Sequence, residues 1–296
     1  MNISEATFSA WSSGPGQTEQ EKCQHAESAV RNAIEADSML SSLDISVFLQ
    51  GSYRARTNVR EDSDVDICVR LNTVAFCDYP PGKTAADYGR VPSDISYVDY
   101  KNLVERALVD YLGQSSVRRG DKAFDVHANT YRVDADVIAA FEHRRYFRDE
   151  TNRWLTGIGF KTDADKLTKN WPQQNYDNGT AKNDRTLRNF KRLVRILKRI
   201  RYNMEDEGID AAKNIPSFLI ECLVWNVPDE GFLHSTYTED VRFVLAHTFN
   251  ATMQDKTCSE WVETNRLKSL FCNSQPWRRD EVNRFLDAAW NYAGFE

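Results

Sequence analysis

The chain has 296 residues, of which 41% are hydrophobic and 28% charged, and its formal net charge is −6. This composition is typical of a globular enzyme whose core needs no disulfide or metal for folding. The acidic balance argues against a broad, sequence-independent nucleic-acid surface, although it leaves room for a local basic cleft. We therefore expect no obligatory nucleic-acid partner.

The cysteines and histidines exclude other classes of protein. None of the six cysteines has C-x-x-C spacing, Cys68 and Cys222 lie in apolar runs, and the five histidines form no H-x-x-x-H pair. This pattern predicts reduced thiols and no zinc site, as in a cytoplasmic protein. We also expect no secretory signal and no membrane span, because no apolar run approaches about 20 residues.

The first half of the chain predicts helices alternating with strands. Mixed charge and many helix formers predict an amphipathic helix over 17–40. β-Branched and aromatic residues predict a strand over 44–50, which Gly51-Ser52 ends, and alternation predicts a second strand over 65–71. Further along we expect a loop at 77–92, a helix at 98–112, and strands at 122–126 and 131–140.

The second half has a different periodicity. Apolar residues recur at helical spacing from Leu187 to Ile200, and the rest of the chain predicts helices separated by Pro216, Pro228 and Pro276. The predicted fold class is therefore α+β, with a mixed β-sheet core and a C-terminal α-helical lobe. The expected domains are residues 1–165, which include the N-terminal helix, and residues 166–296.

Two aspartates on the second predicted strand form the first candidate site. Strand side chains alternate, so Asp64 and Asp66 should lie on the same face about 7 Å apart. Two such carboxylates repel each other unless a cation lies between them, and a pair of Mg²⁺ ions that also bind substrate phosphates would satisfy both. Taken alone, however, D-x-D is typical of an exposed strand with two solvated aspartates.

Gly51-Ser52 makes the metal hypothesis more specific. Glycine permits a sharp turn, and the exposed amides of that turn together with the Ser52 hydroxyl can cradle a triphosphate. An ordinary turn would have the same sequence. The eleven residues between Ser52 and Asp64 suffice for a short helix or loop that returns to the adjacent strand. Phosphate cradle and carboxylates would then meet at one edge of a sheet.

A third carboxylate is expected on a neighbouring strand. Asp134 and Asp136 share one face of the segment 133–139, so periodicity alone cannot choose between them. We favour Asp136, because the apolar residues that follow it place it at the mouth of a buried strand. Asp134 would then be a solvated neighbour or a supporting partner.

Several strings of residues carry a family resemblance. Phe48-Leu49-Gln50-Gly51-Ser52-Tyr53 followed by Asp62-Ser63-Asp64-Val65-Asp66-Ile67 resembles the polymerase-β-like nucleotidyltransferase superfamily. Later strings resemble the bacterial cGAS/DncV-like nucleotidyltransferases (CD-NTases), and among them the CdnE group. These are Thr57-Asn58-Val59-Arg60, the segment Tyr176 to Asn183, and the segment Ile215 to Leu223. The likeness covers nearly the whole chain.

The resemblance implies a two-lobed cyclic dinucleotide synthase with its active site between the lobes. Two Mg²⁺ ions, or Mn²⁺ in their place, would assist in joining two nucleoside triphosphates. Asp64 and Asp66 would hold both ions, Asp136 would hold the one that activates the attacking hydroxyl, and Gln50, Gly51 and Ser52 would bind nucleotide. The product would act on a separate effector protein in antiphage (CBASS) defence, and the enzyme would be a monomer.

A basic segment from Arg188 to Arg201 contains seven Lys and Arg residues and no acidic residue. Such a helix is usually solvated, but in an acidic protein some of these charges should face a phosphate-rich cleft. By resemblance, Lys198 and Ser217 contact the donor triphosphate. Ser217 follows Pro216 and could equally be a helix N-cap.

Asn170 is the candidate for base selection. The resemblance places it in the base pocket, where its amide could pair with the donor and acceptor edge of uracil. The expected substrates are then UTP and ATP, and the expected product is cyclic UMP-AMP or cyclic di-UMP. An ordinary loop asparagine remains the alternative.

Other functions share part of this pattern. A template-independent or oligoadenylate-type nucleotidyltransferase has the same three carboxylates, but a polymerase should also have an RNA-binding extension. A nucleotide-binding scaffold without activity usually lacks one of the carboxylates, and all three are present here. A nucleotidyl-transferring toxin or antibiotic-modifying enzyme typically has a shorter acceptor lobe.

Overall fold

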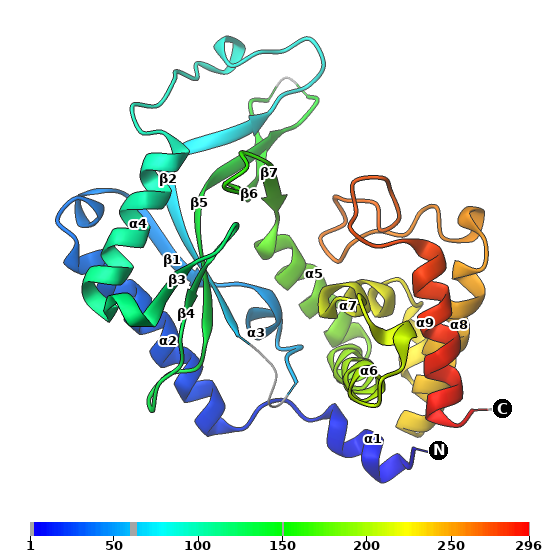
Figure 1. Ribbon diagram of the computed structural model, residues 1–296. Coiled ribbons are helices and arrows are strands. Elements are labelled where there is room, and N and C mark those ends of the chain that lie inside the picture. Colours follow the sequence, from blue (N-terminus) through cyan, green and yellow to red (C-terminus); the bar gives the residue numbers. More distant parts are fainter. Residues whose placement is uncertain (1–2, 60–63, 150, 296) are drawn as a thin grey trace. The chain divides into compact units, whose positions relative to one another are not determined.

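The computed structural model describes residues 3–59, 64–149 and 151–295 (Figure 1). Arg60, Asp62 and Ser63, which belong to the strings that carry the family resemblance, lie outside these described residues.

The described residues form two compact units that interleave along the sequence. The sheet unit comprises 16–53 and 63–172, and the helical unit comprises 1–15, 54–62 and 173–296. The domain boundary expected between residues 165 and 166 remains a proposal.

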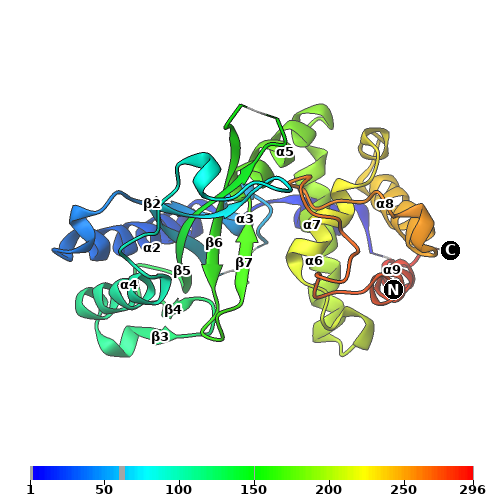
Figure 2. The same cartoon turned by 90° about the horizontal axis from the view of Figure 1, so that it is seen from above.

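The sheet unit is built on a seven-stranded mixed sheet with the order β1-β2-β5-β4-β3, while β6 pairs with β5 and β7 with β6 (Figures 1 and 2). Only the central β2–β5 pair is parallel among the described strands. The strands are β1 Ile45–Leu49, β2 Val65–Asp78, β3 Val117–Arg119, β4 Phe124–Val126, β5 Ala135–Tyr146, β6 Trp154–Lys161 and β7 Leu167–Asn170.

Two helices, α2 (Gln17–Ala36) and α4 (Tyr97–Leu112), cover one face of this sheet (Figure 1). The residues of β2 and β5 that face them are buried and apolar, and the hydroxyl of Tyr100 donates to the Val69 carbonyl at 3.1 Å. The alternate residues on the other side include Asp66 and Asp136, which are only half-buried. We call this second side of the sheet the polar face.

The strands differ in extent from the sequence prediction. β2 runs on to Asp78 through an irregularity between Leu71 and Ala75, and β5 begins at Ala135 instead of residue 131. β3, β6 and β7 were not predicted. Gly157 and Gly159 lower the strand propensity of β6, and β3 and β7 are too short to show a clear alternation.

The helical unit is centred on α6 (Asn189–Asp206). Its predicted apolar stripe is confirmed, because Phe190, Leu193 and Leu197 are at most 1% exposed. The other helices of this unit are α1 Glu5–Ser12, α5 Pro172–Arg185, α7 Ser217–Trp225, α8 Tyr237–Thr252 and α9 Arg279–Ala293. α1 packs against α6 and α8. The short α3, Gly51–Ala55, begins in the sheet unit and ends in the helical unit.

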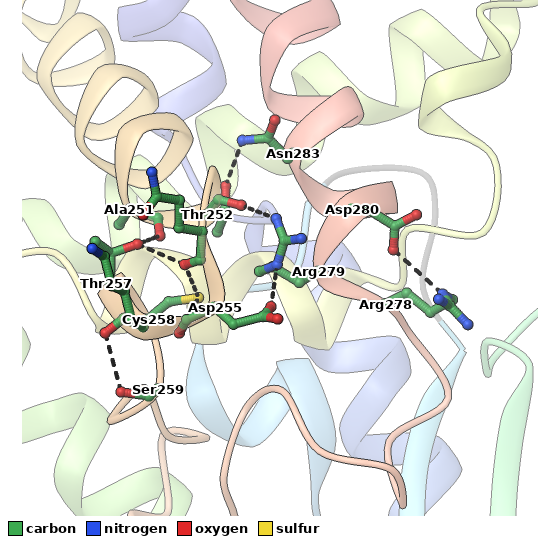
Figure 3. A network of polar contacts seen from close by, with 12 residues as sticks. Ala251, Thr252, Asp255, Thr257, Cys258, Ser259, Arg278, Arg279, Asp280 and Asn283 are labelled. Atoms are coloured by element: carbon green, nitrogen blue, oxygen red, sulfur yellow. Dashed lines mark hydrogen bonds and ion pairs between the residues drawn. The ribbon is translucent and has the colours of Figure 1, made fainter.

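A polar network joins α8 to α9 (Figure 3). The last carbonyls of a helix have no partner within it, and Arg279 supplies one by donating to the Thr252 carbonyl while it pairs with Asp255. Asn283 donates to the Phe249 carbonyl at 2.9 Å and to the Thr252 hydroxyl at 2.9 Å. The network therefore satisfies the C-terminal end of α8 from the neighbouring helix.

In the part of the chain that the structure describes, no helix combines the length and apolar character that a membrane crossing would need.

Candidate active site

The site begins where β1 gives way to the turn at Gly51. The Gln50 amide donates to the Asp66 carbonyl at 2.8 Å, which continues the β1–β2 pairing one residue beyond β1. Gly51 then adopts φ +63° and starts α3. A Cβ at Gly51 would lie 1.8 Å from Asp66 Oδ2 and 2.7 Å from its Cγ. Glycine is thus required there for a steric reason: the Asp66 carboxylate lies directly against the backbone of the Gly-Ser turn.

Strand register brings further carboxylates to the same level of the sheet. Asp66 on β2 lies opposite Asp136 on β5, and Asp136 lies opposite Asp125 on β4. Residues directly opposite each other share a face, and neighbouring strands lie about 4.8 Å apart. Asp64 immediately precedes β2 and is exposed. The polar face therefore gathers negative charge around Asp136.

The electrostatics of Asp136 show that this charge is not fully compensated. Burial raises the pKa of its carboxyl, and the charges of Asp64 and Asp125 raise that pKa further. Asp125 is held in turn by Arg118, whose Nε donates to it at 2.8 Å. A divalent cation bound here would relieve the repulsion between these carboxylates.

The candidate metal ligands can be compared with the way in which proteins bind Mg²⁺. Within residues 3–59, 64–149 and 151–295, no three His, Cys, Asp or Glu side chains are arranged so that they alone could hold a metal ion. Mg²⁺ is commonly bound by one or two carboxylates, with waters and substrate phosphates completing its shell. Asp66 and Asp136 on one face, next to a turn that leaves space only for glycine, fit that mode of binding.

Asp134 has a different environment from Asp136. It precedes β5, accepts a hydrogen bond from the Ala128 amide at 2.7 Å, and lies 3.9 Å from His127 Nδ1. These contacts tie its carboxylate to the loop before β5. They favour Asp136 over Asp134 as the third metal ligand.

Asn170 belongs to the same face as the aspartates. It ends β7 opposite Ile158, which lies opposite Glu142 on β5. Glu142 lies six positions after Asp136 along β5, an even step, so their side chains share a face. The sheet unit thus places Asp66, Asp136 and Asn170 on the polar face.

Lys198 and Ser217 lie in the helical unit. Lys198 is 2% exposed, and its Nζ donates to the Thr57 carbonyl at 3.0 Å. The Thr57 hydroxyl donates to Glu221 Oε2 at 2.6 Å. Ser217 is the first residue of α7, after an N-cap at Pro216, and its hydroxyl lies 2.8 Å from that of Tyr202. Contacts of Lys198 and Ser217 with a triphosphate remain predictions.

Part of the basic charge on α6 supports the fold. Arg195 donates to the carbonyls of Ser12 and Arg56, both at 2.7 Å, and burial together with Arg192 lowers its pKa to about 10. Arg201 pairs with Glu205. The expectation that other cations of this helix face phosphate stays a prediction.

Sequence reasoning gave no structural or functional role to Asp125, Thr57 or Glu221. The alternation of Phe124, Asp125 and Val126 would have placed Asp125 between two buried residues of a predicted strand. Glu221 stands inside an apolar helix, where a charged residue indicates a buried polar partner. Nothing in the local sequence connects it to Thr57, because the two are 164 residues apart.

Comparison with known proteins identifies the family. Residues 177–294 match the model of the cGAS/DncV-like nucleotidyltransferase C-terminal helical domain. Over 290 residues the chain is 44% identical to the cyclic dipyrimidine nucleotide synthase CdnE of Legionella pneumophila, and the alignment covers 97% of each chain.

Two solved structures are similar over almost their full length. The CdnE cyclic dinucleotide synthase of Elizabethkingia meningoseptica with GTP and Apcpp is 36% identical, with a TM-score of 0.83 over 99% of this chain and 100% of that one. The CdnE c-UMP-AMP synthase of Rhodothermus marinus with Apcpp and Upnpp is 31% identical, with a TM-score of 0.86 over 99% and 97%. The predicted fold class and family are confirmed. The chain belongs to the CdnE cyclic dinucleotide synthases, which are nucleotidyltransferases of the cGAS/DncV-like family.

Proposed function

We propose that this synthase uses Mg²⁺ on the polar face to join two ribonucleoside triphosphates, at least one of them UTP. The expected product is cyclic UMP-AMP or cyclic di-UMP. The observation that carries the proposal is the strand register that puts Asp66, Asp136 and Asn170 on one face of one sheet. The polar face thereby offers carboxylates for metal ions and an amide for a base.

Each residue has a part in this proposal. Two Mg²⁺ ions, when bound, would neutralise phosphate charge and make the attacking ribose hydroxyl more acidic. Asp64 and Asp66 would hold both ions, and Asp136 would hold the ion next to that hydroxyl. Gly51 and Ser52 would position the triphosphate through backbone amides and the Ser52 hydroxyl. Gln50, whose own amide pairs with the Asp66 carbonyl, is also proposed to bind nucleotide. Lys198 and Ser217 are proposed to contribute from the helical unit. Catalysis would then consist mainly of positioning and charge stabilisation.

The choice of uridine rests on Asn170 and on two relatives. The amide of asparagine offers a donor group and an acceptor group side by side, as the edge of uracil requires. The relative from Legionella pneumophila is a dipyrimidine synthase, and the one from Rhodothermus marinus is a c-UMP-AMP synthase. The structure from Elizabethkingia meningoseptica contains GTP and Apcpp, so relatives of similar identity differ in the bases they use. Base identity is accordingly the part of the proposal that most needs a test.

The proposed biological setting is the one that the family resemblance implies. We propose that the product is the signal of an antiphage (CBASS) system and acts on a separate effector protein. The enzyme would work as a cytoplasmic monomer that needs no nucleic-acid partner.

The proposed function can be tested by product analysis. The purified enzyme is incubated with Mg²⁺ and all four ribonucleoside triphosphates, treated with phosphatase, and the resistant product is identified by mass. Reactions that each omit one nucleotide show which bases are required. We expect a uridine-containing cyclic dinucleotide that disappears without UTP. Linear oligomers, or a product formed equally well without UTP, would contradict the proposal.

A further inference from the structure

A charged cluster outside the proposed metal site holds the strand that carries Asn170. Among the described strands, β7 pairs only with β6 and so forms an edge of the sheet. It is four residues long, and each of them is only half-buried. Backbone pairing on one side gives such a strand little rigidity. The position of Asn170 must therefore depend on side-chain contacts.

The two neighbours of Asn170 in sequence make those contacts. Lys169 forms an ion pair with Asp78, the last residue of β2. Trp171 is 4% exposed, and its ring meets His143 on β5 edge to face at 5.4 Å. His143 is fully buried, and its Nε2 lies 3.2 Å from Asp78 Oδ2. We call Asp78, His143 and Lys169 the β7 clamp.

Two glycines on β6 make this clamp possible. Gly159 lies opposite Lys169 and Gly157 lies opposite His143, so at these two positions no β6 side chain separates β7 from β5 and β2. A Cβ at Gly157 would lie 2.6 Å from the Asn170 carbonyl oxygen and 2.9 Å from Trp171 Cδ1. The close approach of Asn170 and Trp171 to β6 thus requires glycine.

The charge states support an ion pair between Asp78 and Lys169. Burial alone would raise the pKa of Asp78, but Lys169 and His143 outweigh it and lower that pKa. Burial lowers the pKa of His143, although Asp78 opposes this. Asp78 is therefore ionised at neutral pH and can form the ion pair with Lys169.

The side chains of Lys169 and Asn170 lie on opposite faces of β7. Successive strand residues alternate, so Lys169 lies on the side of His143, whereas Asn170 lies on the polar face with Asp136. We propose that the β7 clamp is a positioning device that fixes Asn170 and thereby sets how strictly the enzyme prefers uridine over adenosine. The inference rests on the proposed role of Asn170 in base selection.

The test compares base preference among variants. Asp78→Asn weakens the ion pair at nearly constant size, and Lys169→Met removes it, whereas Lys169→Arg keeps it. Asp165→Asn is a matched control, because it breaks the Lys161–Asp165 pair of 2.7 Å near the connection between β6 and β7. Two ratios are measured for each variant: UMP to AMP incorporated from equimolar triphosphates, and the Kd of ATP to that of UTP. Thermal unfolding confirms that each variant folds.

We expect Asp78→Asn and Lys169→Met to lower both ratios about fivefold, which corresponds to about 1 kcal/mol. Lys169→Arg and Asp165→Asn should keep the wild-type ratios. In an Asn170→Ala background, Asp78→Asn should have no further effect. The inference is overturned if both clamp variants keep the wild-type Kd ratio, or if Asn170→Ala leaves that ratio unchanged. A wild-type enzyme that makes no uridine product would instead refute the proposed function, while the Kd ratios would still decide the role of the clamp.

Discussion

Substituting Gly51 by alanine isolates the contact between the Gly-Ser turn and the acidic strand. The added Cβ would lie 1.8 Å from Asp66 Oδ2, whereas real Cβ contacts are essentially never under 3.0 Å. The carboxylate must therefore retreat by more than about 1 Å, and such a misplacement at a reacting centre can lower the rate about 100-fold. The backbone at φ +63° adds a cost of roughly 1–2 kcal/mol in stability. We expect Gly51→Ala to lose about 100-fold in kcat with a smaller change in KM.

Gly89→Ala is the matched control for this experiment. Gly89 has φ +59°, and a Cβ there would meet nothing within 4 Å. It should show the same loss of stability in urea unfolding with kcat close to the wild-type value. Both variants are assayed for cyclic product under saturating triphosphates. Equal kcat values for Gly51→Ala and Gly89→Ala would refute the steric reasoning, because only backbone strain would then distinguish either from the wild type.

Two further sets of substitutions each test one carboxylate, Asp163 in the sheet unit and Glu221 in the helical unit. Hydrogen bonds from Arg119 and Lys101 lower the pKa of Asp163 to about 2, so its stabilising effect is complete above its ordinary value of 3.8 and is lost as pH falls through about 2. The gap in the free energy of unfolding between wild type and Asp163→Asn should accordingly close between pH 4 and pH 2 in urea titrations; a gap independent of pH would contradict this assignment. Thr57→Val should lower the free energy of unfolding by about 1–3 kcal/mol, because the buried Glu221 carboxylate loses its 2.6 Å hydrogen bond. Thr57→Ser keeps the hydroxyl and should stay near wild type, and equal losses in the two variants would show that the bond is unimportant.

The local sequence pattern was sufficient to predict several strands and the buried face of one helix. β-Branched and aromatic residues located β1, alternation of polar and apolar residues located β2, a strand was predicted near β4, and the apolar residues after Asp136 marked the buried part of β5. The apolar stripe of α6 likewise follows from spacing that any helix of this type must have.

What the sequence did not reveal depends on contacts between distant residues. Gly157 and Gly159 weaken the strand signal of β6, yet they are present because Trp171, Asn170 and Phe76 pack where their side chains would be. Lys198 resembles the other cations of α6 in sequence, but it is buried against Thr57. Such partners become visible only when the register of the strands and the packing of the helices are known.

The central claim is that Asp66 and Asp136 act together as metal-binding carboxylates on the polar face. The measurement that tests it most directly is single-turnover formation of cyclic product with Mg²⁺ by Asp66→Asn, Asp136→Asn and Asp134→Asn, each shown to fold by circular dichroism. The account predicts that Asp66→Asn and Asp136→Asn lose product formation, whereas Asp134→Asn, whose carboxylate holds the loop before β5, retains it. Full activity in Asp136→Asn would contradict the account. A loss of activity in Asp134→Asn, with Asp66→Asn and Asp136→Asn still active, would contradict it as well.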